Sequence, residues 1–86
     1  MTLTLRPGMS TADTDYGTTL LDEDSGEYFT LNPTASLALR TLLDGGTLEQ
    51  AAEALTAEYA VDIGTAGQDV ADLLAELRSA RLVTER

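Results

Sequence analysis

The amino-acid composition changes abruptly near residue 32, and this change constrains the fold more than any other feature of the chain. Residues 1–31 are rich in Thr, Tyr, Phe and Gly, whereas residues 33–83 are rich in Ala, Leu and Glu. The first composition favours strands and the second favours helices. Strands that precede helices without alternating with them are typical of an α+β domain with an antiparallel sheet. A chain of 86 residues has room for one small domain, which we expect to span residues 1–86.

Three short segments of the first part predict strands. Residues 2–6 alternate between apolar and polar side chains, and Pro7-Gly8 ends this segment. Residues 16–21 and 27–31 are rich in β-branched and aromatic side chains, and the turn-forming residues 22–26 separate them. We therefore expect these three segments to form a three-stranded antiparallel sheet.

The second part carries start and stop signals for three helices. Asn32-Pro33 is typical of an N-cap followed by Pro at the first helical position, and Gly45-Gly46 indicates the end of that helix. Residues 47–50 (TLEQ) form a capping box, and residues 65–68 (TAGQ) predict a second one at the start of the last helix. The expected order is three strands followed by three helices, an arrangement similar to a winged helix.

The chain contains no Cys, His or Lys, and this absence excludes several kinds of chemistry. Without Cys there is no disulfide, thiol nucleophile or zinc–thiolate site. Without His the commonest general base is missing. A catalytic pair of carboxylates would need a cleft that excludes water, which a domain of this size rarely supplies. We therefore expect a protein that is not an enzyme and that uses no metal and no cofactor.

The net charge is strongly negative and argues against nucleic acid as a partner. The sequence has 15 acidic and 5 basic residues, which gives a net charge of −10. Binding to a phosphate backbone relies on Lys and Arg, so the expected helices would be repelled by DNA. No apolar run approaches the roughly 20 residues of a membrane span, and residues 1–10 lack the features of a signal peptide. We therefore expect no membrane contact and a cytoplasmic location.

The acidic segment at residues 22–25 suggests two other functions. In a calcium loop that starts at Asp22, Gly would fall at position 5 and Pro33 at position 12, where an EF-hand needs Gly at 6 and Glu at 12. The pair Asp24-Ser25 resembles the attachment motif of carrier proteins, but a Gly and an aromatic strand follow it rather than an apolar helix. An acyl or peptidyl carrier protein and a small acidic regulatory partner remain the alternative functions.

The expected third strand could bind an extended peptide. A three-stranded sheet has two edge strands, and an edge strand presents unpaired backbone donors and acceptors. An extended peptide can add to such an edge as a further strand. The alternation of the segment places Phe29 and Leu31 toward the core and Tyr28 on the opposite face.

Residues 16–83 resemble the PqqD-like family, the precursor-peptide recognition elements of ribosomal peptide biosynthesis. The resemblance rests on the segment 26–33 (GEYFTLNP), on the turn 44–47 (DGGT), and on an ordered set of later positions. These positions are Leu55, Tyr59, Ala60, Val61, Leu74, Leu77, Leu82 and Val83. Within the family the chain is most similar to the separate recognition proteins of lasso-peptide pathways.

The resemblance implies that the protein binds the leader segment of a precursor peptide and presents it to the maturation enzymes. These partners would be a leader peptidase of cysteine-protease type and an ATP-dependent cyclase. The leader would add beside the third strand and dock against the third helix, and it would carry a Tyr-x-x-Pro motif that needs apolar pockets. By position, the peptide-binding residues are Glu27, Tyr28, Phe29, Thr30, Leu31, Asp69, Val70, Asp72, Leu73, Glu76 and Leu77.

The expected third helix is acidic on the side that the resemblance assigns to the peptide. Asp69, Asp72 and Glu76 would form the rim of the groove, which suits a leader with basic residues. For Asp69 there is a simpler alternative, because a carboxylate in the first turn of a helix stabilises the helix dipole.

Overall fold

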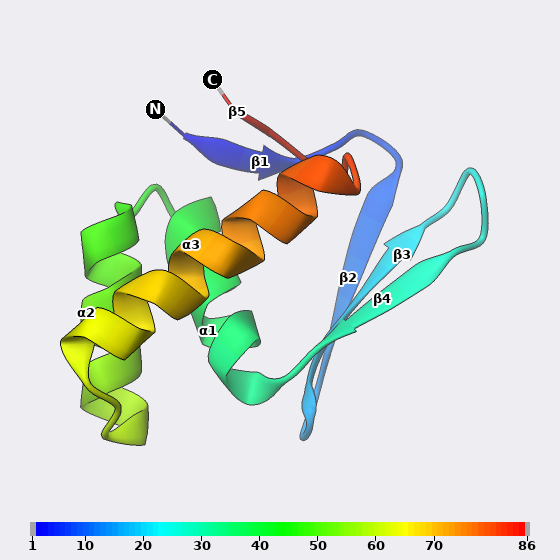
Figure 1. Cartoon of the computed structure of the whole chain (residues 1–86). Coiled ribbons are helices and arrows are strands. Elements are labelled where there is room, and N and C mark those ends of the chain that lie inside the picture. Colours follow the sequence, from blue (N-terminus) through cyan, green and yellow to red (C-terminus); the bar gives the residue numbers. More distant parts are fainter. Residues whose placement is uncertain (1, 86) are drawn as a thin grey trace.

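A three-stranded antiparallel sheet and three helices make up most of the computed structural model, which describes residues 2–85 (Figure 1). In chain order the elements are β1 (Leu3–Leu5), β2 (Met9–Thr14), β3 (Gly17–Asp22), β4 (Tyr28–Leu31), α1 (Pro33–Leu43), α2 (Leu48–Tyr59), α3 (Ile63–Ser79) and β5 (Val83–Glu85). The α+β class and the three-stranded antiparallel sheet followed by three helices are confirmed. The likeness to a winged helix stays a prediction.

The strands that form the sheet differ from the predicted ones. The order is β2-β3-β4, whereas β1 pairs with β5 in a separate two-stranded sheet. The prediction wrongly placed residues 2–6 in the main sheet and missed both β2 and β5. β2 has the sequence MSTADT and is mostly exposed, so it lacks the alternation that marks a half-buried strand. It is held by its pairing with β3 through the turn at Asp15-Tyr16.

Gly17 allows β3 to start directly beside the end of β4. Its φ angle is +135°, and a Cβ added there would lie 1.8 Å from the carbonyl oxygen of Leu31. Only glycine therefore fits at this position.

Asp22 organises the turn between β3 and β4. Its carboxylate accepts hydrogen bonds from the backbone N–H of Asp24 at 3.0 Å and from the guanidinium of Arg6 at 2.6 Å. Burial acts to raise the pKa of Asp22, but hydrogen bonds from the Asp24 and Ser25 backbone, from Arg6 and from the Ser25 side chain together hold this pKa below its ordinary value.

The predicted caps of the first two helices are present. Asn32 caps α1, since its side-chain oxygen accepts the N–H of Ala35 at 2.8 Å. Thr47 and Gln50 cap α2 reciprocally: the Gln50 N–H donates to the Thr47 hydroxyl at 3.1 Å, and the Thr47 N–H donates to the Gln50 side chain at 2.8 Å. Both helices therefore begin where the sequence predicted.

α3 begins earlier than predicted. Its N-cap is Asp62, whose carboxylate accepts the N–H groups of Gly64 at 3.0 Å and Thr65 at 3.1 Å. The predicted capping box at residues 65–68 is therefore wrong, because Asp62 caps the helix three residues upstream and residues 65–68 lie inside its first turns. Asp69 consequently lies beyond the first turn, which contains no acidic residue, so the helix dipole does not explain it.

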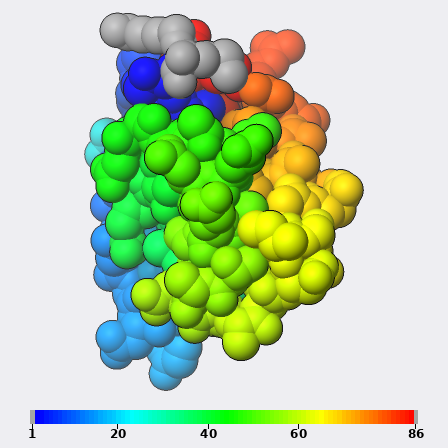
Figure 2. All heavy atoms as spheres, turned by 90° about the vertical axis from the view of Figure 1, so that its left-hand side faces the viewer, coloured from blue at the N-terminus to red at the C-terminus, as the bar shows by residue number. Residues whose placement is uncertain are grey.

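The helices lie on one side of the sheet, and α2 and the beginning of α3 lie side by side on the face that points away from it (Figures 1 and 2). Leu20 of β3 is fully buried beneath α1 and belongs to one core with Leu39, Leu55 and Val70. In β4, Phe29 and Leu31 pack partly against this core. Tyr28 is 70% exposed, which confirms the predicted alternation of the strand.

Candidate functional site

β4 lies at an edge of the three-stranded sheet. Within residues 2–85 it pairs with β3 alone, with Leu20 opposite Phe29 and Thr18 opposite Leu31. The other flank of β4 is therefore an open strand edge, as the sequence predicted for this segment.

The register determines which backbone groups face this open edge. The N–H of Asp22 donates to the carbonyl of Glu27 at 2.8 Å, so these two residues form a hydrogen-bonded pair. Hydrogen-bonded and non-hydrogen-bonded pairs alternate along an antiparallel ladder, so Phe29 bonds to β3 whereas Tyr28 and Thr30 do not. The N–H and C=O groups of Tyr28 and Thr30 therefore point outward and offer two donors and two acceptors.

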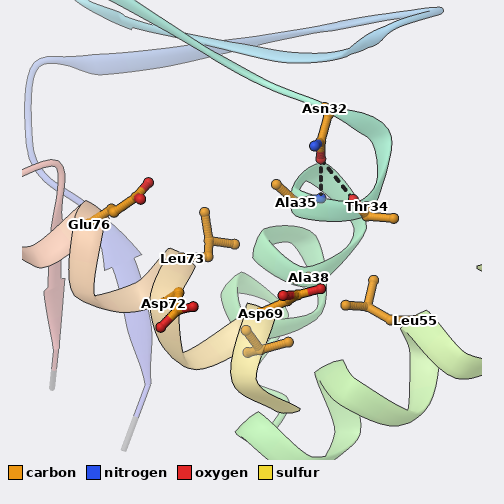
Figure 3. Close-up of a pocket in the computed structure, with 10 residues that line it drawn as sticks. Asn32, Thr34, Ala35, Ala38, Leu55, Asp69, Asp72, Leu73 and Glu76 are labelled. Atoms are coloured by element: carbon orange, nitrogen blue, oxygen red, sulfur yellow. Dashed lines mark hydrogen bonds between the residues drawn. The ribbon is translucent and has the colours of Figure 1, made fainter. Parts of the chain in front are cut away.

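A hollow of about 300 Å³ begins where β4 ends (Figure 3). Residues from the start of α1, from one side of α3 and from α2 line it. They are Asn32, Thr34, Ala35, Ala38, Leu55, Asp69, Val70, Asp72, Leu73 and Glu76. Asn32 follows directly on β4, so the hollow begins where the open strand edge ends, and we call the edge and the hollow together the groove.

The groove has an apolar floor and an acidic rim. Half-buried Ala35 supplies apolar surface at the start of α1, and the buried Ala38 and Leu55 close the hollow from below. On α3, Leu73 and Glu76 point toward the side on which β4 runs (Figure 3). An extended chain in this groove would meet hydrocarbon below and carboxylates at its side.

The acidic rim consists of three carboxylates on one face of α3. Asp69, Asp72 and Glu76 are spaced by three and four residues, which places them on neighbouring turns. Asp72 accepts a hydrogen bond from the side-chain amide of Gln68 at 2.8 Å. Every ion pair within residues 2–85 lies elsewhere, so no arginine of that part of the chain compensates the rim. The rim therefore attracts cations.

The structure brings together five of the predicted site residues. The hollow is lined by Asp69, Val70, Asp72, Leu73 and Glu76. Val70 is only 1% exposed, so its contribution is mostly structural.

The other predicted residues do not line the hollow. Leu77 is buried in the core. Glu27 precedes β4, and the residues of β4 lie along the open edge. A direct role of the eleven residues in peptide binding stays a prediction.

Sequence reasoning missed the α1 and α2 side of the groove. Asn32 was recognised only as a cap, and its side-chain oxygen also accepts the hydroxyl of Thr34 at 2.8 Å. Ala35 and Ala38 are small and line the hollow, and Ala38 also belongs to the core together with Leu39 and Leu42 of the same helix. Two alanines three residues apart, at the start of a helix that follows an edge strand, are a signal that could have indicated the groove.

The structure also bears on the carrier-protein, metal and membrane interpretations of the sequence. Ser25 lies in the turn between β3 and β4, where its hydroxyl accepts the N–H of Glu27 at 3.2 Å, and not at a helix start as in a carrier protein. Within residues 2–85 no group of three or more Asp or Glu side chains is close enough to hold a metal ion. In the same range no helix has both the length and the apolar character that crossing a membrane requires.

Comparison with known proteins agrees with the sequence resemblance. The model of the family "Coenzyme PQQ synthesis protein D (PqqD)" matches residues 17–83. A solved structure of a lasso peptide synthetase B1 complexed with the leader peptide is 42% identical, covers 99% of this chain and 100% of its own, and superposes with a TM-score of 0.89. TbiB1 in complex with the TbiA(beta) leader peptide is 29% identical over 100% of this chain and 98% of its own, with a TM-score of 0.83. No curated protein sequence matches. The chain belongs to the PqqD family.

Proposed function

We propose that this protein binds the leader segment of a ribosomally made precursor peptide and presents it to the enzymes of lasso-peptide maturation. The observation that carries the proposal is the open edge of β4, which ends at a hollow with an acidic rim. Two neighbours in structure, at 42% and 29% identity, are described as complexes with a leader peptide.

The leader binds by adding a strand to β4. Its backbone pairs with the N–H and C=O groups of Tyr28 and Thr30, which β3 leaves unused. Each such bond contributes about 0.5–1.5 kcal/mol net, so this pairing alone gives weak binding. Affinity and specificity therefore depend on side chains of the leader that enter the hollow over Ala35, Ala38 and Leu73.

The acidic rim selects the charge of the leader. Asp69, Asp72 and Glu76 line the groove, and no arginine in the described part of the chain pairs with them. Basic residues of the leader restore the charge balance and speed the encounter of the two molecules. The full set of proposed contact residues is that predicted from the sequence, with Val70 and Leu77 acting from the core beneath the groove.

The protein acts on its partners without chemistry of its own. The chain lacks Cys, His and Lys, and its carboxylates lie on an open groove rather than in a closed cleft. A bound leader raises the effective concentration of the scissile segment at a leader peptidase of cysteine-protease type. An ATP-dependent cyclase then acts on the core peptide.

A cleavage assay with three arms tests this function. Full-length precursor is incubated with the peptidase alone, with this protein alone, and with both. We expect cleavage to rise only in the combined arm, and we expect a precursor without its leader to gain nothing.

Two outcomes would contradict the proposal in different ways. Cleavage by this protein alone would show that it is an enzyme. Equal rates with and without it, at concentrations where calorimetry confirms leader binding, would exclude presentation and leave passive binding.

A further inference from the structure

Two large aliphatic side chains are exposed at the rim of one hollow on the face formed by α2 and α3. Leu48 is 46% exposed and Ile63 is 55% exposed. Both border a hollow of about 360 Å³ whose other lining residues are Glu49, Ala52, Glu53 and Gly67. We call these six residues the α2–α3 surface, and Figure 2 shows the face on which α2 and the beginning of α3 meet.

Neither exposed side chain takes part in capping the helix that carries it. Leu48 and Ile63 are the first residues of α2 and α3, and the caps at Thr47 and Asp62 hold both helix starts. Capping therefore does not require an apolar residue at either position, and exposed apolar side chains that cluster mark interaction sites. Leu48 also borders a second hollow of about 240 Å³, so it stands as a ridge between two depressions.

The charge around this surface indicates the chemistry of its occupant. Glu49 and Glu53 lie one helical turn apart beside the hollow, and neither takes part in an ion pair within residues 2–85. A partner that inserts an apolar side chain and flanks it with Arg or Lys would complement both features. A second copy of this chain would bring the same glutamates and a net charge of −10, so self-association is disfavoured.

The position of the surface relates it to the leader groove. On α2, Ala52 faces this hollow whereas Leu55 faces the groove. On α3, Gly67 borders the hollow and Asp69 borders the groove. A protein docked on the α2–α3 surface would therefore lie beside the leader while the open edge of β4 stays free.

We propose that the α2–α3 surface docks the peptidase that removes the leader, through an apolar side chain of that enzyme flanked by Arg or Lys. The proposal rests on the function proposed above, since it assigns a second surface to the same act of presentation. It separates two binding sites on one small domain: the groove for the precursor and the α2–α3 surface for the enzyme.

Two variants test the surface while they preserve the fold. Ile63→Ser removes an exposed apolar side chain. Gly67→Arg fills the hollow and adds a repelling charge, and it replaces a helical glycine at a position where an added Cβ meets nothing within 4 Å. The matched controls are Tyr16→Ser, at an exposed aromatic in the β2–β3 turn, and Ala57→Arg, at an exposed position of α2.

The measurement is binding of each variant to the purified peptidase by surface plasmon resonance, with the leader peptide present, and leader binding alone by calorimetry. Thermal melts confirm that each variant is folded. We expect Ile63→Ser and Gly67→Arg to weaken peptidase binding about tenfold or more, as loss of a central contact does. Leader affinity should be unchanged in all variants, and both controls should match the parent protein.

The outcomes separate this inference from the proposed function. Unchanged peptidase binding in both variants overturns the inference, and so does a parent protein that binds the leader but not the peptidase. A dimer of the parent protein that the two variants abolish overturns it in favour of a second copy. Absence of leader binding by the parent protein would instead overturn the proposed function itself.

Discussion

Proline at Thr30 should weaken leader binding without unfolding the protein. The register directs the N–H of Thr30 to the open edge of β4, so its removal costs the sheet no hydrogen bond. Proline is tolerated in edge strands for this reason. The leader loses one backbone bond and meets the pyrrolidine ring at closest approach. We expect a loss of about 1–2 kcal/mol, which corresponds to a roughly five- to thirtyfold rise in Kd.

Phe29→Pro is the matched control, because the N–H of Phe29 is directed to β3. This change removes a bond inside the sheet and should lower the melting temperature of the free protein. Thr30→Ala separates the backbone from the side chain, since the hydroxyl is exposed and the N–H is kept. We expect Thr30→Ala to bind the leader like the parent protein.

The assay is calorimetric titration of a synthetic leader peptide into each variant, with a thermal melt of the free protein. Tyr28→Pro removes the second outward N–H and should behave like Thr30→Pro. If both proline variants are folded and bind the leader with unchanged affinity, the leader does not add to this edge and the reasoning from the register is refuted.

Three further results are expected. Changing Asp72 to Asn and Glu76 to Gln together should slow association with a basic leader and flatten its salt dependence in stopped-flow measurements, whereas neutralising two carboxylates in the strand turns should not. Gly17→Ala should destabilise the protein by at least about 3 kcal/mol in denaturant unfolding, because its Cβ would collide with the Leu31 carbonyl; a stable variant would contradict the turn geometry. The folded-state pKa of Asp22 is below the unfolded value of about 3.9, so the ionised Asp22 stabilises the protein above that pH, and this stabilisation is lost as pH falls through the folded pKa. The difference in unfolding free energy between the parent protein and Asp22→Asn should therefore shrink in that pH window, and a difference that stays constant with pH would contradict this assignment.

The parts of the fold that were predicted correctly depend on local interactions. Asn32-Pro33 and the box at residues 47–50 satisfy helix donors within one turn, so the sequence alone locates the starts of α1 and α2. β2 forms because it pairs with β3, and its polar sequence alone does not indicate a strand. The prediction of the start of α3 was wrong for another reason: Asp62 and Thr65 are both favourable N-cap residues, and only the structure shows that Asp62 is the one used.

Only one side of the candidate site could be predicted from the sequence, because the other side depends on contacts between helices. The spacing of Asp69, Asp72 and Glu76 places them on one face of any helix, and the family resemblance assigned that face to the groove, so the acidic rim could be predicted. The floor is formed in part by Ala35 and Ala38, which line the hollow only because α1 stands next to α3 in space. The spacing of these two alanines after an edge strand is the one local signal for this side of the hollow, and the sequence does not show that α3 lies opposite them.

The pairing of β1 with β5 has a consequence for how this domain can be joined to other proteins. Leu3 lies opposite Glu85 and Leu5 opposite Val83, so the start of β1 and the end of β5 lie side by side (Figure 1). Adjacent ends allow a domain to be inserted into a surface loop of a host enzyme with short linkers and little distortion of either partner. The same pairing makes β1 and β5 part of the core, since Leu3 and Val83 are buried. A fusion should therefore add residues outside β1 and β5, because trimming either strand would open the core.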